Sequence, residues 1–449
     1  MPSPDDPPQH SAAGPAQTLS LGDAVGIVVG LVIGAGIFKT PSLVAANTGT
    51  EWVMIAVWIA GGVVSVIGAL CYAELATAYP HAGGDYHFVG RAFGRELSFL
   101  YAWARMTVIA AGSIALLAFV FGDYCTRLFP LGEHSPAVYA ALLVSALTGV
   151  NIVGIRAGKR TQNWLTVCEV GGLVIVVIAG LFLAPATAPA QAAVADRPWY
   201  AGVGLSMIFV LLTYGGWNEA AYVSAEVKDR NRNIIRSLLL SLGVVIVLYV
   251  LVNIAYLRGL GMAAMSKSDV VAADLLARVW GENGARLISL IIAVSTLTSV
   301  NATIIVGARS NFALGREWPL FSFLARWDSA SGAPRNSYVF QAAIALGLIL
   351  LGALTRKNFE TMVDYTAPVF WAFFLLVGLS LFVLRTHEPE RERPFRVPFF
   401  PVTPLLFVLS CFYLLYSSLA YTGVGALVGV GVLATGAVVM LFGRRRARA

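Results

Sequence analysis

Charged side chains are scarce in this sequence. Asp, Glu, Lys and Arg make up 12% of the 449 residues, about half of the roughly 25% that is usual in soluble globular proteins. Hydrophobic residues make up 58%, and the mean hydropathy is +0.75. A soluble globule of this length would not be so apolar, so the composition predicts an all-α, polytopic membrane protein.

Patterns that belong to enzymes are also missing. The sequence contains no HExxH, GxSxG or P-loop motif, and these are the short signatures of metalloprotease, hydrolase and nucleotide chemistry. Histidine is rare and scattered over the tail and the loops. We therefore expect no enzyme, with no catalytic residue, no cofactor and no metal site; the five histidines are His10, His81, His87, His134 and His387.

Lys and Arg are absent from the first twenty positions, which are rich in Pro, Ala, Ser and Gln. A signal peptide would need a basic start. We expect residues 1–20 to form a disordered cytoplasmic tail.

Long apolar runs are abundant. A membrane-spanning helix needs about 20 mainly apolar residues, and about twelve runs meet this requirement. They centre on residues 21–43, 52–79, 97–128, 137–155, 164–184, 203–223, 237–257, 287–312, 339–354, 362–384, 404–421 and 424–442.

The basic residues predict the orientation of these spans. An even number of spans puts both termini on one side, and with the N-terminus inside, the inner loops hold about 21 Lys and Arg against about 9 outside. This excess predicts an inner (cytoplasmic) membrane protein with both termini in the cytoplasm. It also explains the net charge of +7 without a nucleic acid partner. The longest outer loop, 258–286, has room for short interfacial helices.

Glycines interrupt two of the apolar runs. Gly34-Ala35-Gly36 lies within the first run, GIVVGLVIGAGIFKTP at 26–41, and Gly215-Gly216 lies within the sixth. Unpaired backbone is costly in hydrocarbon, so such a break persists only where it lines a cavity or binds a ligand. A broken helix offers free N–H groups at one end and free carbonyls at the other. An alternative for the first run is a ridge of small residues for close helix packing.

The positions of the two interrupted runs predict the topology. Members one and six of twelve are the expected places in a transporter built from two five-helix inverted repeats. The predicted core is 21–385, with repeat one at 21–185 and repeat two at 199–385. Two further helices and a basic tail occupy 386–449.

Six motifs in this order and spacing make the sequence resemble the amino acid–polyamine–organocation (APC) superfamily, in particular bacterial relatives of the L-type amino acid transporters. They are VIGAGIF (32–38), YAELATAYPHAGGDYHFVGRAFG (72–94), LYAWARMTVIAAGSIALLA (100–118), TYGGWNEAAYVSAEVKDRNRN (213–233), SVNATIIVGARSNFALGRE (299–317) and RPFRVPFFPVTP (393–404). The resemblance implies a LeuT-type fold with helices 1 and 6 broken in the middle of the membrane. It also implies alternating access around a central site for a free amino acid.

The resemblance also implies the site residues. The amides of Gly34, Ala35 and Gly36 would receive the substrate carboxylate, and carbonyls near Ile33 and around Leu212, Thr213 and Gly215 would receive the α-amino group. Asn218 and Asn301 are candidates for polar contacts, with satisfied interhelical amides as the alternative.

Several positions depart from the family pattern. Ala35 replaces the usual serine and removes one hydroxyl. Leu212 replaces an aromatic gate, so either Phe209 or another aromatic substitutes, or the substrate is smaller. No cysteine lies in the outer stretch 129–136, so no disulfide-linked heavy subunit is expected. We expect free, buried thiols at Cys71, Cys125, Cys168 and Cys411.

Glu169 in the fifth run is the most consequential departure, because the sodium-independent relatives carry lysine there. An ionisable group inside a span is a functional hypothesis by default. Glu169 could exchange a proton during the cycle, help to bind a cation, or be a solvated residue near the start of its helix. The sequence therefore predicts a secondary active transporter of amino acids, by exchange or proton-coupled uptake. The alternative is a carrier of polyamines or cationic amines.

Overall fold

The computed structural model describes residues 20–81, 84–153, 159–185, 199–219, 228, 230–328, 333–355, 357–421 and 424–447. Every regular element in these ranges is a helix, and one isolated bridge pairs Asp328 with Ala333. The all-helical class is therefore confirmed. The predicted tail, 1–20, lies outside the described residues except for Ser20.

The helical elements follow in chain order. They are α1 (Leu21–Val32), η1 (Ala35–Phe38), α2 (Thr40–Thr48), α3 (Glu51–Ala78), α4 (Asp85–Phe93), α5 (Arg95–Ala104), η2 (Arg105–Ile109), α6 (Ala110–Leu128), α7 (Ser135–Val153), α8 (Lys159–Ile178), η3 (Ala179–Leu183), α9 (Trp199–Thr213), η4 (Trp217–Glu219), α11 (Arg230–Leu260), α12 (Met262–Met265), α13 (Val271–Glu317), η6 (Pro319–Ala325), α14 (Arg335–Thr355), α15 (Asn358–His387), α16 (Val402–Ala420) and α17 (Val424–Ala447).

Eight helices in the described ranges are long and apolar enough to cross a membrane: Glu51–Ala78, Arg95–Leu128, Ser135–Val153, Arg232–Leu260, Val271–Glu317, Arg335–Thr355, Asn358–His387 and Val402–Ala420. Shorter apolar helices lie at Val167–Leu183, Gly202–Thr213 and Gly425–Leu441. Together they overlap every predicted run except the first, which is divided between α1 and α2, and they cover the sixth only as far as Thr213. The chain is a multi-pass helical membrane protein.

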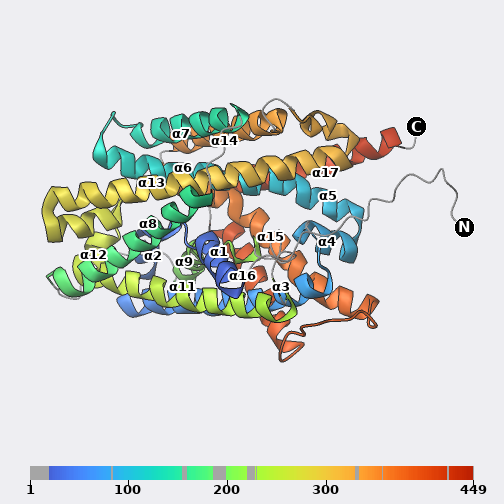
Figure 1. Ribbon diagram of the computed structural model, residues 1–449, viewed down its shortest axis with the longest axis horizontal. Coiled ribbons are helices and arrows are strands. Elements are labelled where there is room, and N and C mark those ends of the chain that lie inside the picture. The colour runs from blue at the N-terminus through green and yellow to red at the C-terminus, as the bar shows by residue number, and fades with distance from the viewer. Residues whose placement is uncertain are drawn as a thin grey trace, which may run out of the picture.

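Helices that are far apart in the sequence pack side by side. α3 lies against α11, α6 against α13 and α7 against α14. Figure 1 shows the long helices running roughly along the longest axis of the molecule, with α1 and α9 near its middle. One end carries α12 and is called the α12 end below. The opposite end carries α4 and the last turns of α17 and is called the α4 end.

Short helices cover the α12 end, where the sequence predicts an outer loop. α12 follows α11 directly, and α13 changes direction at Trp280 and Gly281, which has φ 64°. The residues of α13 before Trp280 form a separate short helix against the rest of the end. The stretch 258–286, for which the sequence predicts room for short helices, therefore contains them.

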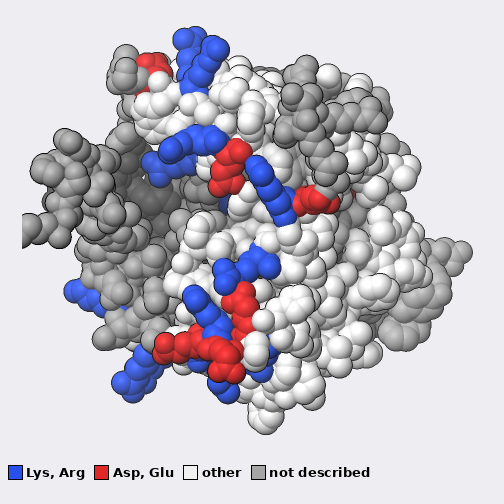
Figure 2. All heavy atoms as spheres, turned by 90° about the vertical axis from the view of Figure 1, so that its right-hand side faces the viewer, with Lys and Arg blue, Asp and Glu red and all other residues white. Residues whose placement is uncertain are grey.

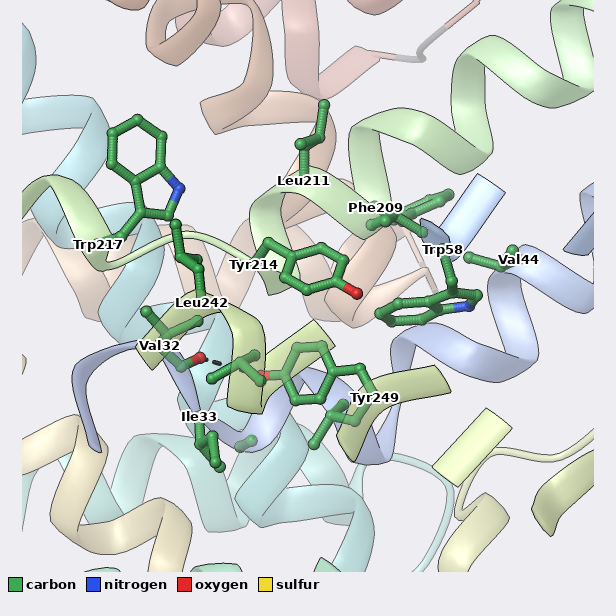
Figure 3. Packing of buried hydrophobic residues seen from close by; sticks show 14 of the residues in the cluster. Val32, Ile33, Val44, Trp58, Phe209, Leu211, Tyr214, Trp217, Leu242 and Tyr249 are labelled. Atoms are coloured by element: carbon green, nitrogen blue, oxygen red, sulfur yellow. Dashed lines mark hydrogen bonds between the residues drawn. The ribbon is translucent and has the colours of Figure 1, made fainter. Parts of the chain in front are cut away.

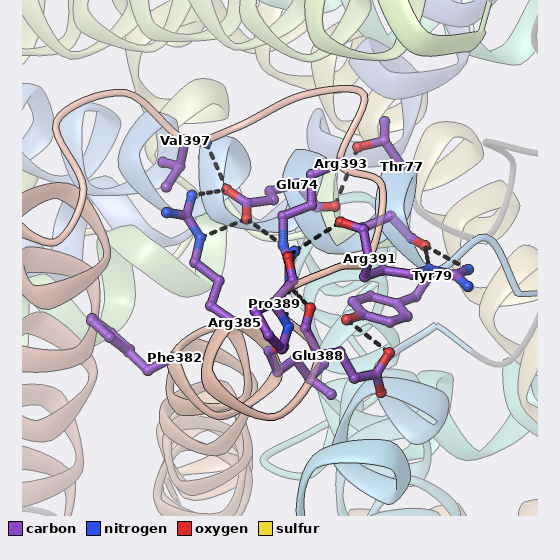
Figure 4. Close-up of polar contacts among 12 residues, drawn as sticks. Glu74, Thr77, Tyr79, Phe382, Arg385, Glu388, Pro389, Arg391, Arg393 and Val397 are labelled. Carbon is purple, nitrogen blue, oxygen red and sulfur yellow. Dashed lines mark hydrogen bonds and ion pairs between the residues drawn. The ribbon is translucent and has the colours of Figure 1, made fainter.

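Charged residues of both signs are interspersed at the α4 end (Figure 2). At its centre Glu74, which is fully buried at the end of α3, accepts hydrogen bonds from Nε of Arg385 at 2.8 Å and from the backbone N–H of Val397 at 2.7 Å. Arg393 lies 3.5 Å from the same carboxylate. Figure 4 shows how these contacts fasten the segment after α15 across the end of α3.

A second ion pair lies beside it. Nε of Arg91 on α4 donates to Glu388 at 2.7 Å, and this hydrogen bond holds the pKa of Glu388 below its usual value. α4 is therefore fastened to the same segment as α3.

Candidate functional site

The predicted interruption of the first run is present. α1 ends at Val32, Gly34 is extended with φ −127° and ψ 176°, and a new helix, η1, begins at Ala35. The first N–H groups of a helix have no partner within it. The break therefore offers donors at Ala35 and Gly36, on the side of the new helix, and carbonyls at the end of α1.

The sixth run is interrupted as well. α9 ends at Thr213, Tyr214 to Gly216 form a turn with φ 105° at Gly216, and η4 begins at Trp217. Gly215 donates its N–H to the carbonyl of Leu212 at 3.2 Å. A positive φ is cheap only for glycine, which explains why glycine stands at the turn.

The two breaks lie against each other. A Cβ added to Gly216 would lie 2.2 Å from the carbonyl oxygen of Leu31, and one added to Gly36 would lie 3.3 Å from Oγ1 of Thr213. Oγ1 of Thr213 is also 2.8 Å from Oγ1 of Thr40. A Cβ added to Gly34 would meet no atom within 4 Å. The breaks therefore approach closely through glycine, with open space beside Gly34.

Tyr249 of α11 joins the two breaks and is not among the site residues predicted from the sequence. Its hydroxyl is 3.0 Å from the carbonyl oxygen of Val32 and 3.4 Å from that of Thr213. The backbone of Gly34 also lies within hydrogen-bonding reach of this hydroxyl. Figure 3 shows the Tyr249 hydroxyl directed at Val32. The available signal was a phenol within an apolar run, shared with Tyr256 of the same run, because a buried hydroxyl needs a partner.

Aromatic packing fixes the Tyr249 ring. Trp58 of α3 lies edge-on to Tyr249 at 5.7 Å between ring centroids, and Tyr214 lies 5.1 Å away. Edge-to-face pairs add to the energy of burial. The hydroxyl is therefore held rigidly between the ends of α1 and α9.

The remaining predicted substrate residues lie on or beside the breaks. Ile33, Ala35 and Thr213 are buried, whereas Gly34, Gly36, Leu212 and Gly215 are partly accessible. Asn218 is buried in η4.

Phe209 and Asn301 lie farther along their helices. Phe209 is buried one turn before Thr213, whose hydroxyl is 2.8 Å from the Phe209 carbonyl oxygen. Asn301 on α13 accepts a hydrogen bond from Nδ2 of Asn151 on α7 at 2.7 Å. This contact is the interhelical amide bond predicted as the alternative for Asn301.

Glu169 lies eleven residues into α8 and is 5% exposed. Its Oε1 atom has no hydrogen-bond partner among the described residues. Ser295 of α13 lies beside Glu169, and Tyr249 is near enough to Glu169 for the two groups to interact electrostatically. Such burial does not fit a solvated residue at a helix start. The carboxyl group belongs to the surroundings of the two breaks.

Fold and site together define a class: a multi-pass helical membrane protein in which two interrupted helices meet and leave peptide groups beside an open space. The comparison with known proteins gives the family. The chain belongs to the amino acid permease family, whose model matches residues 19–442, and so to the APC superfamily that its motifs resemble. This is a family of permeases, not of enzymes.

Individual relatives agree with this assignment. The chain is 30% identical over 424 residues to the b(0,+)-type amino acid transporter 1 of Mus musculus, covering 92% of this chain and 85% of that protein. It is 30% identical over 442 residues to the large neutral amino acids transporter small subunit 2 of Mus musculus, which covers 95% of this chain and 80% of that protein. The b(0,+)-type amino acid transporter 1 of Homo sapiens is 29% identical over 406 residues, which covers 88% of this chain and 81% of that protein.

Proposed function

We propose that this protein is a secondary active transporter that moves amino acids across the cytoplasmic membrane by alternating access, through exchange or proton-coupled uptake. The contact between the two interrupted helices, with open space beside Gly34, carries this proposal. Peptide groups left without helical partners in an apolar protein are maintained where they bind a polar ligand. A free amino acid supplies both an anion and a cation for them.

The substrate carboxylate would lie at the start of η1, where unpaired N–H groups and the helix dipole favour negative charge. The hydroxyl of Tyr249 already lies at the backbone amide of Gly34, so the carboxylate site centres on the amides of Ala35 and Gly36. The α-amino group would lie against carbonyls of Ile33, Leu212, Thr213 and Gly215. Asn218 would add a polar contact, whereas Phe209 and Asn301 would act in gating.

Glu169 would couple transport to a proton. A buried carboxyl group with an unpartnered oxygen costs least when neutral, and opening toward water would favour its ionised form. Because Glu169 interacts electrostatically with Tyr249, a change in the ionisation of Glu169 would be felt at the ends of both broken helices, which Tyr249 joins. Uptake would then depend on pH.

The proposed architecture is the LeuT-type fold, with about twelve membrane helices and a 5+5 inverted repeat. The pairing of α3 with α11, α6 with α13 and α7 with α14 supports two repeats at 21–185 and 199–385, with 386–449 adding two helices and a basic tail. The basic residues favour the α4 end as the cytoplasmic side, together with both termini. The protein would work without a disulfide-linked heavy subunit.

A second candidate is a carrier of polyamines or cationic amines. It is favoured by Glu169, because a buried carboxylate without a partner would be stabilised by a cationic side chain of the substrate. The two candidates differ in the charge of the ligand and not in the fold.

A ligand screen separates them. Purified protein would be heated with each free amino acid and polyamine, since a ligand that binds the folded state raises its melting temperature. Hits would then be tested for uptake into proteoliposomes, with the Gly34→Val variant as control. Saturable uptake that is stimulated by internal substrate and lost in the control supports a carrier with this site. Linear flux, or wild-type uptake by Gly34→Val, contradicts it.

A further inference from the structure

The residues immediately after the first break are tied to the α12 end by contacts that the proposed substrate site does not use. Lys39 lies between η1 and α2, and its side chain is 8% exposed. Its ammonium nitrogen is 2.9 Å from Oδ2 of Asp123 on α6. It also donates to the carboxylate and to the backbone carbonyl of Asp269, both at 3.1 Å. One buried cation thus joins three parts of the fold.

The neighbours of Lys39 strengthen this attachment. The carbonyl of Phe38 accepts a hydrogen bond from the hydroxyl of Tyr124 at 2.9 Å, and Tyr124 follows Asp123 on α6. On the other side, α12 packs against α2. The half of the first broken helix that offers its amides is therefore fixed both to α6 and to the loop that joins α12 to α13.

The two acids differ in how strongly they hold Lys39. The side chain of Asp123 is 9% exposed, whereas that of Asp269 is 90% exposed. Removing one partner of a buried ion pair is strongly unfavourable, but water readily replaces an exposed carboxylate, and exposed pairs contribute little. The contact with Asp123 is therefore the persistent one, and the contact with Asp269 is the one that can open.

We propose that Lys39, Asp123 and Asp269 form an outer clamp that holds η1 and α2 against the loop before α13, and that separation of Asp269 from Lys39 opens the path to the two breaks from the α12 end. During opening Lys39 keeps its charge paired with Asp123, so the ammonium is never buried alone. The inference deepens the proposed function, because it names the contact that would close the substrate site on one side.

Accessibility of a buried reporter cysteine tests the clamp without any substrate. Ala272, in the first turn of α13, is fully buried and stands three positions after Asp269. The full-length chain, with its four native cysteines replaced by serine and Ala272 by cysteine, would be placed in lipid nanodiscs, where both faces meet solvent. The rate of labelling by a polar maleimide then reports opening.

Asp269→Asn should raise this rate about two- to fivefold, the range that an exposed ion pair supports. Lys39→Gln should raise it further, and Lys39→Arg, which keeps the charge, should stay close to the parent. Glu282→Gln is the matched control. It removes another ion pair of the α12 end, Arg127 to Glu282 at 2.7 Å, which joins α6 to α13 and does not touch η1 or α2.

Faster labelling in Asp269→Asn than in Glu282→Gln supports the clamp. Equal rates in these two variants overturn it, whether both rise or neither does. Asp269→Asn alone decides the matter if Lys39→Gln does not fold, because the Asp269 side chain is at the surface. If the protein shows the expected labelling but no amino acid uptake, the proposed function is wrong and the clamp is supported. If the protein transports amino acids but its labelling is unchanged by Asp269→Asn, the clamp is wrong and the proposed function is supported.

Discussion

Two glycines on opposite sides of the contact between the breaks should respond to substitution with opposite changes in stability. Gly216 has φ 105°, and a Cβ there would lie 2.2 Å from the carbonyl oxygen of Leu31. The left-handed conformation costs an ordinary residue about 1–2 kcal/mol. Overlap with a backbone atom, which cannot rotate away, adds about 1–3 kcal/mol. Gly216→Ala should therefore destabilise the folded protein by about 2–5 kcal/mol.

Gly34 is the reverse case. Its extended backbone suits any residue, and a Cβ there meets open space. Where the native backbone already suits alanine, replacing glycine stabilises a protein by about 0.4–1 kcal/mol, because the unfolded chain loses freedom. Gly34→Ala should therefore fold as well as the parent or better. Gly34→Val should also fold, but its methyl groups would occupy the space proposed for the substrate and abolish uptake.

Thermal melting of the purified variants in detergent, followed by uptake in proteoliposomes, checks both expectations. The pattern is a lower midpoint for Gly216→Ala and an unchanged or higher midpoint with lost uptake for Gly34→Val. A Gly216→Ala protein as stable as the parent would show that the two backbones do not approach as described. A loss of folding in Gly34→Val would show that the space beside Gly34 is not open.

Further predictions concern groups around the site and at the α4 end. Tyr249→Phe leaves the carbonyls of Val32 and Thr213 without their partner, so thermal melting should show a loss of about 1–3 kcal/mol together with weaker uptake. Glu169→Gln should flatten the pH dependence of uptake measured in proteoliposomes at several pH values, whereas an unchanged profile would remove its coupling role. Glu74→Gln removes a fully buried carboxylate and leaves the largely enclosed Arg385 without its ion pair, and about 3–5 kcal/mol of stability should be lost, seen as early melting. Burial, together with the charges of His81, Arg91 and Arg391, lowers the pKa of His87 below its usual 6.5. The stabilisation that neutral His87 provides is therefore complete above pH 6.5 and is lost as the pH falls through the lowered pKa. Between about pH 7.5 and about pH 5, the melting temperature of His87→Gln should fall by less than that of the parent.

The interruptions at Gly34 and Gly216 could be predicted because they are local. Small residues grouped inside an apolar run break its helical pattern, and the cost of unpaired backbone in hydrocarbon makes such a break meaningful. The spans were predictable for the same reason, since length and hydropathy are properties of short windows of sequence.

The partners of the breaks could not be predicted. Lys39 and Asp269 are separated by 230 positions, and nothing near Lys39 in sequence distinguishes it from a basic residue of an outer loop. Its place after the first run puts it among the basic residues predicted for the outer side, yet its side chain is only 8% exposed. Asn301 shows the same limit, because the sequence allowed an interhelical amide bond there but did not identify Asn151 as its partner. Contacts of this kind depend on which helices pack together, not on local pattern.

The polar groups at the first break differ in whether the protein itself satisfies them, and this difference explains how the break can persist without substrate. The carbonyls of Val32 and Phe38 accept hydrogen bonds from Tyr249 and Tyr124. Because these tyrosines come from α11 and α6, the surrounding helices hold the ends of the break apart. The N–H groups at the start of η1 have no helical partners, so they remain for a ligand with negative charge. A helix that continued across Gly34 would need the Val32 carbonyl for its own backbone bonding, so the hydrogen bond from Tyr249 to this carbonyl favours the interrupted form.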